Sequence, residues 1–232
     1  MADTAREPMR VLVSCEFSGR VRDAFRALGH DAVSCDLLPT EVPGPHIRGD
    51  FRDLLSDVYF GRSEPYDLLI AHPPCTYLCN SGVRWLFNKD GTENQERMAK
   101  VHEAHNLFWD CLNTFPKVAR SVCVENPIPH KYAKLPDYTQ KIQPWQFGDF
   151  ETKATCLWLR NLPSLTPTAG FKDRRFVKNR LQRVHLESPG PERSKNRSRT
   201  YYGIAAAMAE QWGGNAMPSE LARSIAGSVS KR

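Results

Sequence analysis

The sequence predicts an α/β fold built on a doubly wound, mostly parallel sheet. The apolar run Met9–Cys15 predicts a strand, Val21–Leu28 carries apolar residues at helical spacing, and Asp31–Asp36 predicts a second strand. A strand, a helix and a strand in this order form a βαβ unit, whose two strands lie parallel. Since ligands bind at the carboxyl ends of such strands, functional residues are expected directly after each strand.

The same alternation continues downstream and completes a main domain over residues 9–127. A short strand is expected to end near Asp50, and Asn94–Phe115 predicts a long helix with one apolar side. Asp67–Ala71 and Val122–Val124 predict two further buried strands.

The rest of the chain divides into two parts. Over residues 128–199 prolines, aromatic residues and basic residues dominate, and Thr155–Leu159 is the one firm strand, which predicts a small inserted subdomain. Residues 200–232 predict C-terminal helices, Gly203–Gln211 and Ser219–Val229, that return to the main domain.

The composition argues against a disulfide-stabilised or membrane-bound protein. The 232 residues include seven cysteines, and no hydrophobic secretory leader is present. An odd number of cysteines without a leader predicts free thiols in a reducing cytoplasm. No apolar stretch approaches the roughly 20 residues that a membrane-spanning helix needs, so no membrane partner is expected.

The net charge of +6 is concentrated in one block, Lys172–Arg199, which holds ten Lys or Arg against three acidic residues. Such a block is either a solvated surface or a site that binds phosphates. Five of its side chains are candidates for a track along a nucleic-acid backbone: Arg174, Arg175, Lys178, Arg180 and Arg183.

Pro73-Pro74-Cys75 places a thiol where a buried strand should end. The two prolines lack N–H donors and fix φ, so they stiffen the backbone just before the sulfur. A thiol held in this way is a candidate nucleophile, and the alternative is a small buried apolar residue.

Three other side chains are expected at the same edge of the sheet. Glu125 follows the strand Val122–Val124, so a carboxyl and the thiol of Cys75 are delivered to one substrate. Gly19 follows the first strand, where a close backbone approach to a cofactor demands a small residue. Asp36 ends the second strand, where an acid commonly accepts hydrogen bonds from ribose hydroxyls.

In their order along the chain these motifs resemble the DNA (cytosine-5)-methyltransferase family. Phe17-Ser18-Gly19 is similar to its cofactor loop, Pro73-Pro74-Cys75 to its catalytic loop, and Glu125-Asn126-Pro127 to its Glu-Asn motif. Gly214-Asn215-Ala216-Met217-Pro218 is similar to the family's closing motif, and Lys153, in Thr152–Thr155, lies at the nearest match to its arginine-bearing strand. The resemblance covers about residues 9–127 and 198–230.

The resemblance implies an S-adenosylmethionine-dependent enzyme with a Rossmann-like methyltransferase fold. Residues 9–127 then form the cofactor-binding and catalytic domain, and residues 128–199 form a reduced target-recognition region, as in a compact, phage-like member acting in the host cytoplasm. The implied cofactor contacts come from Phe17, Ser18, Gly19, Asp36 at the ribose, Asp50 at the adenine, Pro73 and Asn215. The implied partner is duplex DNA with its target cytosine flipped out of the helix.

The implied catalytic residues are Cys75, Glu125 and Lys153. The thiolate of Cys75 adds to C6 of cytosine, which requires the pKa of this thiol to fall below about 8.5. Glu125 hydrogen-bonds the N3 edge of the base, a role for which a raised carboxyl pKa is best suited. Lys153 supplies the positive charge of the missing arginine.

Two alternatives remain open at this point. The short recognition region allows a related enzyme that modifies C5 of free pyrimidine nucleotides or transfers another group. A catalytically silent nucleic-acid-binding homologue is the other alternative.

No metal is expected. The histidines of His102-Glu103-Ala104-His105 are spaced i, i+3, one position short of the metalloprotease motif. Cys79 follows Cys75 at a spacing unlike that of zinc deaminases, and it is expected to be a packed residue beside the site.

Overall fold

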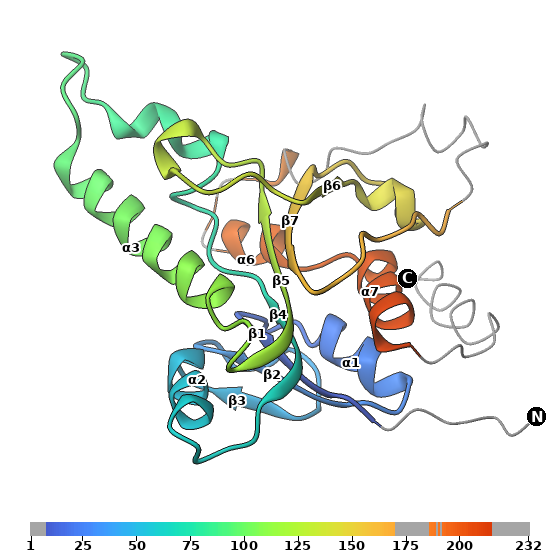
Figure 1. Cartoon of the computed structure of the whole chain (residues 1–232). Coiled ribbons are helices and arrows are strands. Elements are labelled where there is room, and N and C mark those ends of the chain that lie inside the picture. The colour runs from blue at the N-terminus through green and yellow to red at the C-terminus, as the bar shows by residue number, and fades with distance from the viewer. Residues whose placement is uncertain (1–7, 170–185, 189, 191, 215–232) are drawn as a thin grey trace, which may run out of the picture.

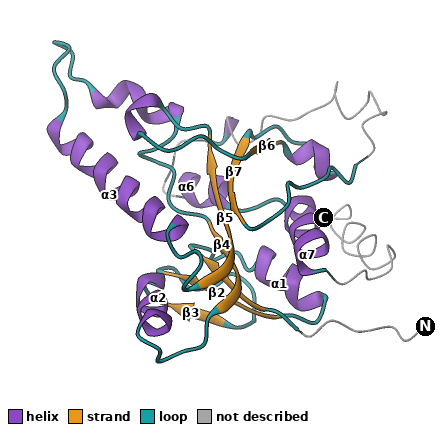
Figure 2. Ribbon diagram, in the orientation of Figure 1, coloured by secondary structure: helices purple, strands orange, loops and turns teal. Residues whose placement is uncertain are grey.

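The structure is a computed structural model that describes residues 8–169, 186–188, 190 and 192–214. Its centre is a seven-stranded sheet in the order β3-β2-β1-β4-β5-β7-β6 (Figures 1 and 2). The strands are β1 (Arg10–Ser14), β2 (Asp31–Asp36), β3 (His46–Arg48), β4 (Tyr66–Ala71), β5 (Ala119–Pro127), β6 (Gln140–Ile142) and β7 (Thr155–Arg160). Strands β1 to β5 are parallel, whereas β7 runs antiparallel to both β5 and β6. The predicted α/β fold with a mostly parallel sheet flanked by helices is therefore confirmed.

Helices cover both faces of this sheet (Figure 2). The α-helices of the described chain are α1 (Arg20–Ala27), α2 (Phe51–Tyr59), α3 (Gln95–Leu112), α6 (Arg193–Ser198) and α7 (Tyr202–Gly213), and the short 3₁₀ helices are η1 (Asn80–Leu86), η2 (Lys131–Ala133) and η3 (Pro144–Phe147). In Figure 1, α2 and α3 lie on one side of the strands and α1 and α7 on the other.

The alternation of side chains along the strands builds one apolar core on each face. Val13 and Ile70 pack with Met208 of α7 in one cluster. Leu12 and Leu69 belong to the other cluster, which faces α2 and α3. Because both faces are buried, the central strands are continuous apolar runs, as is usual in parallel sheets.

The residues after Pro127 differ from the expected loose subdomain in one respect. The antiparallel strands β6 and β7 extend the main sheet beyond β5, with Glu125 opposite Leu157 and Pro127 opposite Thr155. The region therefore shares the sheet of the first part of the chain and holds β7 directly against the strand that carries Glu125.

Two α-helices of the described chain were not expected from the sequence, α2 and α6. Asp50 is the N-cap of α2, and its side chain accepts a hydrogen bond from the backbone N–H of Arg52. Asp before an apolar run is a recognised start signal, so the sequence contained this information. The other helix, α6, is only six residues long and basic, without an apolar periodicity. The helix expected at Ser219–Val229 lies outside the described residues.

The direction in which strands are added reverses between β1 and β4, which are neighbours in the sheet. A crevice forms at the carboxyl ends of strands where such a reversal occurs. The residues that follow β1 and β4 therefore lie where a ligand is expected. Within the described residues, no helix is both long enough and apolar enough to cross a bilayer.

Candidate active site

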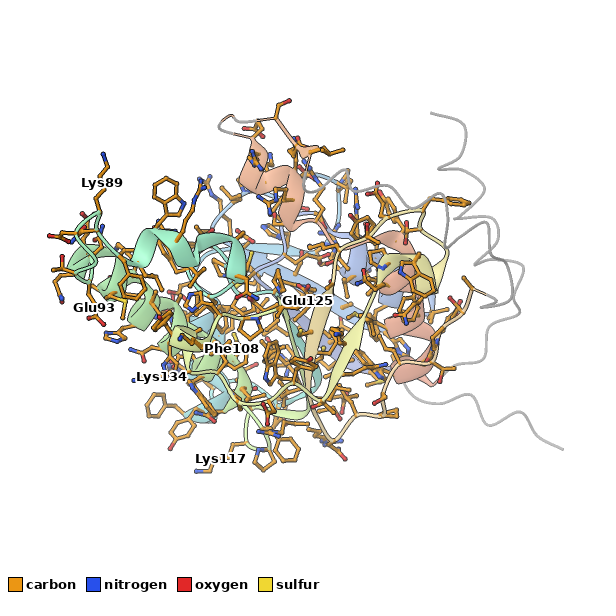
Figure 3. All side chains as sticks on the ribbon, turned by 90° about the horizontal axis from the view of Figure 1, so that it is seen from above. Lys89, Glu93, Phe108, Lys117, Glu125 and Lys134 are labelled. Carbon is orange, nitrogen blue, oxygen red and sulfur yellow. The ribbon has the colours of Figure 1, made fainter. Side chains whose placement is uncertain are left out.

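The ends of β4 and β5 bring the thiol loop and the Glu-Asn pair together. The two strands are paired in parallel, with Ala71 opposite Val124. The side-chain amide of Asn126 donates a 2.9 Å hydrogen bond to the carbonyl oxygen of Pro73. This bond holds the loop that bears Cys75 against the end of β5. Figure 3 labels Glu125 in the middle of the molecule, whereas Lys89 and Glu93 lie at the far end of the arm formed by η1 and α3.

Cys75 is half-buried at the start of a tight turn. The backbone N–H groups of Leu78 and Cys79 both donate to its carbonyl oxygen, each at 3.0 Å. This turn places Cys79 one helical turn beyond Cys75, and the two thiols are hydrogen-bonded to each other. Cys79 is buried, and its sulfur also lies 3.0 Å from the hydroxyl of Ser81.

The contact between the two thiols shifts their pKa values in opposite directions. The hydrogen bond with Cys75 lowers the pKa of Cys79, and the hydroxyl of Ser81 favours the same thiolate. The hydrogen bond with Cys79 and burial together raise the pKa of Cys75. The raised pKa of Cys75 differs from the sequence-based expectation of a lowered pKa at this thiol. The sequence predicted that Cys79 is a packed residue beside the site, and the structure buries it there, against Cys75.

Glu125 is buried at the end of β5 and is held by its neighbours as a carboxylate. Burial alone raises the pKa of this carboxyl, but a hydrogen bond with His72 and the charge of Lys153 lower it to below its ordinary value. The Nδ1 atom of His72 lies 3.2 Å from Oε2 of Glu125. We expected a raised pKa, and the structure gives the opposite direction because two basic side chains face the carboxylate.

Lys153 approaches both reactive groups from the loop before β7. Its positive charge lowers the pKa of Cys75 and of Glu125. Its Nζ atom donates a 3.1 Å hydrogen bond to the carbonyl oxygen of Arg197 in α6. The three side chains that the sequence marked as catalytic are therefore neighbours, although they come from three separate parts of the chain.

A small cleft adjoins this group at the carboxyl ends of β1 and β4. Its lining consists of Cys15, Glu16, Phe17, Ser18, His72, Ser198, Arg199 and Thr200. Cys15 has a positive φ of 56°, which is unusual for a residue with a side chain and turns the chain sharply after β1. The cleft lies at the predicted position of the cofactor loop.

Glu16 lines the cleft, and its carboxylate lies at the N-terminus of α1. Its carboxylate accepts hydrogen bonds from the backbone N–H of Val21 at 2.7 Å and of Arg22 at 3.3 Å, and from the hydroxyl of Ser18 at 3.2 Å. The N-terminus of α1 would otherwise attract an anion. Because an internal carboxylate already occupies it, the cleft is unsuited to a phosphate group.

Gly19 is required by the protein's own packing. Its φ is 72°, and an added Cβ would lie 2.5 Å from the guanidinium of Arg22 and 2.7 Å from Val42. Arg22 is fully buried and reaches from α1 to the loop after β2, where it donates to the carbonyl oxygens of Val42 and Pro43. A close approach to a cofactor was the expected reason for this glycine, and the structure supplies Arg22 as a sufficient one.

The ring of Phe17 lies beneath two cationic side chains, one from α6 and one from the residue that follows this helix. Lys195 and Arg199 lie 5.5 Å and 5.8 Å from the centre of its ring. Arg199 also forms a two-pronged ion pair with Glu41, with N–O distances of 2.6 and 2.7 Å. This pair ties the segment that covers the cleft to the loop after β2.

Asp36 and Asp50 lie on the β2 side of the cleft, and both act on the pKa of Cys15 electrostatically. Asp36 is half-buried, and burial raises its pKa although it accepts a 2.9 Å hydrogen bond from the N–H of Leu38. The oxygens of Asp50 are both engaged by Arg52, whose hydrogen bonds lower the pKa of Asp50. Asp36 therefore has more capacity than Asp50 to accept hydrogen bonds from a ligand.

The other candidates lie outside the described residues. These are Asn215 of the closing motif and the five basic side chains Arg174, Arg175, Lys178, Arg180 and Arg183. Within the described part of the chain, no group of three or more His, Cys, Asp or Glu side chains is placed to hold a metal ion.

Sequence reasoning missed three polar residues at this site, namely Glu16, Arg22 and His72. His72 sits directly after β4, so the rule that functional residues follow strands contained the signal. Glu16 follows the predicted first strand in the same way, whereas Arg22 offered no comparable signal, because its role depends on partners brought close by folding. In the comparisons with known proteins, no family model matches this chain, and no curated protein matches it significantly.

Proposed function

We propose that this protein transfers a methyl group from S-adenosylmethionine to C5 of cytosine in DNA, through a covalent bond between Cys75 and C6 of the base. The observation that carries this proposal is the meeting of Cys75, Glu125 and Lys153 beside a cleft that follows β1. A nucleophile, an N3 partner and a cation next to a separate donor pocket are the parts that this reaction requires.

The thiol chemistry explains why a cysteine suits this substrate. C5 of cytosine is a poor nucleophile until another nucleophile adds at C6 and turns the ring into an enamine. A thiolate adds readily at neutral pH because it is both acidic and strongly nucleophilic. The sulfur of Cys79 lies within hydrogen-bond reach and can accept the proton of Cys75, a transfer that the lowered pKa of Cys79 opposes and that contact of Cys75 with the base must drive.

Glu125 begins as a carboxylate, so its first role is to accept a hydrogen bond from the exocyclic amino group of cytosine. Thiolate addition at C6 places negative charge on the ring, and a proton that Glu125 takes up from water and passes to N3 would stabilise the adduct. His72 and Lys153 surround Glu125 and hold it in one orientation for this contact. When the C5 proton is removed by a base, Cys75 leaves and the double bond re-forms.

The cleft fits the proposed methyl donor better than a phosphate-bearing cofactor. Glu16 occupies the N-terminus of α1 and repels phosphate, whereas a sulfonium and an ammonium group are favoured beside a carboxylate. Asp36 is available for ribose hydroxyls, and the exposed side chain of Leu37 next to it offers apolar surface for adenine. The donor supplies an electrophilic methyl group, and these residues would bind and orient it.

DNA is the proposed substrate because a basic side chain lies near the thiol loop and the sequence carries a basic block. Arg197 of α6 acts electrostatically on Cys79, which places this guanidinium near the thiol loop. Five residues of the basic block, Arg174, Arg175, Lys178, Arg180 and Arg183, lie outside the described residues and are proposed as phosphate contacts from the sequence.

Transfer of a tritiated methyl group separates the possible substrates. The purified protein is incubated with labelled S-adenosylmethionine and either duplex DNA, single-stranded DNA or deoxycytidine nucleotides. Label in 5-methylcytosine of DNA supports the proposal. Label in nucleotides alone would identify a pyrimidine nucleotide enzyme, and DNA binding without any transfer would identify a silent homologue.

A further inference from the structure

His72 links the two halves of the site. It follows β4, and its backbone N–H donates a 3.0 Å hydrogen bond to the carbonyl oxygen of Ser14 at the end of β1. Its side chain is only 6% exposed. One ring nitrogen faces Glu125, and His72 is also one of the residues that line the cleft formed by residues 15–18 and 198–200.

The two nitrogens of His72 have different partners. Glu125 is a carboxylate and can only accept a hydrogen bond, so Nδ1 carries the hydrogen that it donates. In the neutral ring Nε2 is then a bare acceptor. Nε2 is buried and has no hydrogen-bond partner within the described residues. A buried polar atom without a partner is unusual, and a ligand that enters the adjoining cleft would satisfy it.

The charges around His72 indicate which ligand group fits. Glu125 contacts the ring, Asp36 interacts with it electrostatically, and Glu16 lines the same cleft. The nearby cations of the covering segment, Arg199 and Lys195, are already paired with Glu41. Lys153 faces Glu125 and donates to a backbone carbonyl. An added cation with hydrogen-bond donors is therefore favoured over an added anion.

We propose that Nε2 of His72 accepts a hydrogen bond from the ammonium group at the amino-acid end of the methyl donor, while its Nδ1–H orients Glu125. This inference rests on the proposed function. One side chain then contacts the donor and also positions the residue that faces the base.

Two substitutions of His72 test the roles of its two ring nitrogens separately. Asparagine at position 72 places an amide N–H near the position of Nδ1 but has no atom at the position of Nε2. Glutamine reaches the position of Nε2 and loses the atom at the position of Nδ1. His72→Asn therefore removes the proposed donor contact, whereas His72→Gln retains an acceptor for it.

Binding of two product analogues by calorimetry tests the inference without turnover. S-adenosylhomocysteine carries the ammonium group, and 5′-methylthioadenosine lacks the whole amino-acid end. We expect His72→Asn to weaken S-adenosylhomocysteine about tenfold or more, and to leave 5′-methylthioadenosine within about twofold. We expect His72→Gln to bind S-adenosylhomocysteine within about threefold of wild type. Circular dichroism checks that both variants fold.

The outcomes distinguish this inference from the proposed function. If wild type binds both analogues and His72→Asn weakens both equally or neither, the contact of Nε2 with the ammonium group is wrong while donor binding stands. If wild type binds neither analogue, the proposed function itself fails. A readout for positioning comes from methyl transfer, where His72→Gln should lower kcat with KM for the donor nearly unchanged. An unchanged kcat would contradict the role of Nδ1.

Discussion

The side-chain amide of Asn126 donates a hydrogen bond to the carbonyl oxygen of Pro73, and this contact spans the gap between β5 and the thiol loop. Asn126 is 1% exposed, so the bond is shielded from water. It explains why a Glu-Asn pair and a Pro-Pro-Cys loop occur together in this chain. Glu125 faces the substrate edge, while the next residue fixes the loop that carries the nucleophile.

Asn126→Ala should therefore lower activity by displacing the loop rather than by removing a reacting group. The substitution leaves the carbonyl of Pro73 buried without a donor, which destabilises the protein by about 1–3 kcal/mol. Urea unfolding measures the stability loss, and the rate of alkylation of Cys75 reports loop position. Unchanged stability together with an unchanged alkylation rate would show that the loop is held by other contacts. Asn88→Ala, which removes an exposed amide bonded to Thr92, is the matched control.

Cys75→Ala should abolish methyl transfer and leave the affinity for S-adenosylhomocysteine within about threefold, because the thiol contacts the base and not the donor. DNA that contains 5-fluorocytosine should form a stable adduct with the wild type, since fluorine does not leave as a proton does. Denaturing gel electrophoresis detects this adduct, and it should be absent from Cys75→Ala. Turnover above about a tenth of the wild-type value would remove Cys75 from the mechanism.

Cys79→Ala should make Cys75 easier to ionise, because the hydrogen bond with Cys79 is the largest cause that raises the pKa of Cys75. Alkylation of Cys75 by iodoacetamide, followed by mass spectrometry over a range of pH, measures this effect. We expect the midpoint for alkylation of Cys75 to lie at a lower pH in Cys79→Ala than in the wild type. Cys79→Ser, which restores a hydroxyl, should give an intermediate midpoint. Identical profiles for all three proteins would show that the sulfurs ionise independently.

Glu125→Gln retains the size of the side chain and removes its charge. Turnover should fall by about 10²–10⁴, the usual contribution of general acid–base catalysis. A fall of less than about threefold would mean that N3 is activated by another group. Measurement of kcat at saturating DNA separates this effect from weaker substrate binding.

The pKa of Glu125 also predicts how this variant responds to pH. The folded-state pKa lies below the ordinary carboxyl value, so ionised Glu125 stabilises the protein above that ordinary value, and this contribution disappears as the pH falls through the folded-state pKa. The difference in unfolding free energy between wild type and Glu125→Gln should therefore shrink as the solution is acidified. A difference that grows towards acid pH would mean that Glu125 is protonated in the folded protein.

Gly203→Ala should destabilise the protein although alanine is the better helix former. A Cβ at this position in α7 would overlap the carbonyl oxygen of Phe147 and lie 2.8 Å from Oδ2 of Asp149. Relief of this overlap moves α7 away from η3 and costs about 1–3 kcal/mol. Thermal unfolding measures the loss, and Gly49→Ala is the control because a Cβ there meets nothing within 4 Å. Equal melting temperatures for the two variants would contradict the packing.

The order of strands and helices over residues 9–127 was predictable from local patterns. Apolar runs such as Asp67–Ala71 have the length and composition of buried strands, and residues that follow parallel strands share one edge of the sheet. The approach of Cys75 and Glu125 follows from these two facts, whereas Lys153 reaches them from the loop before the antiparallel strand β7. The strand β6, three residues long, and the helix α6 carry no periodicity that marks them.

The sequence by itself determined which side chains reach the edge of the sheet, because the positions of the strands along the chain and the alternation of side chains within them are local properties. Only the tertiary structure decided their chemical states. The pKa of Glu125 is lowered because His72 and Lys153 face it from other parts of the chain, and the pKa of Cys75 is raised because a turn places Cys79 against it. Burial and neighbouring charges set a pKa, and both depend on contacts between residues far apart in the chain.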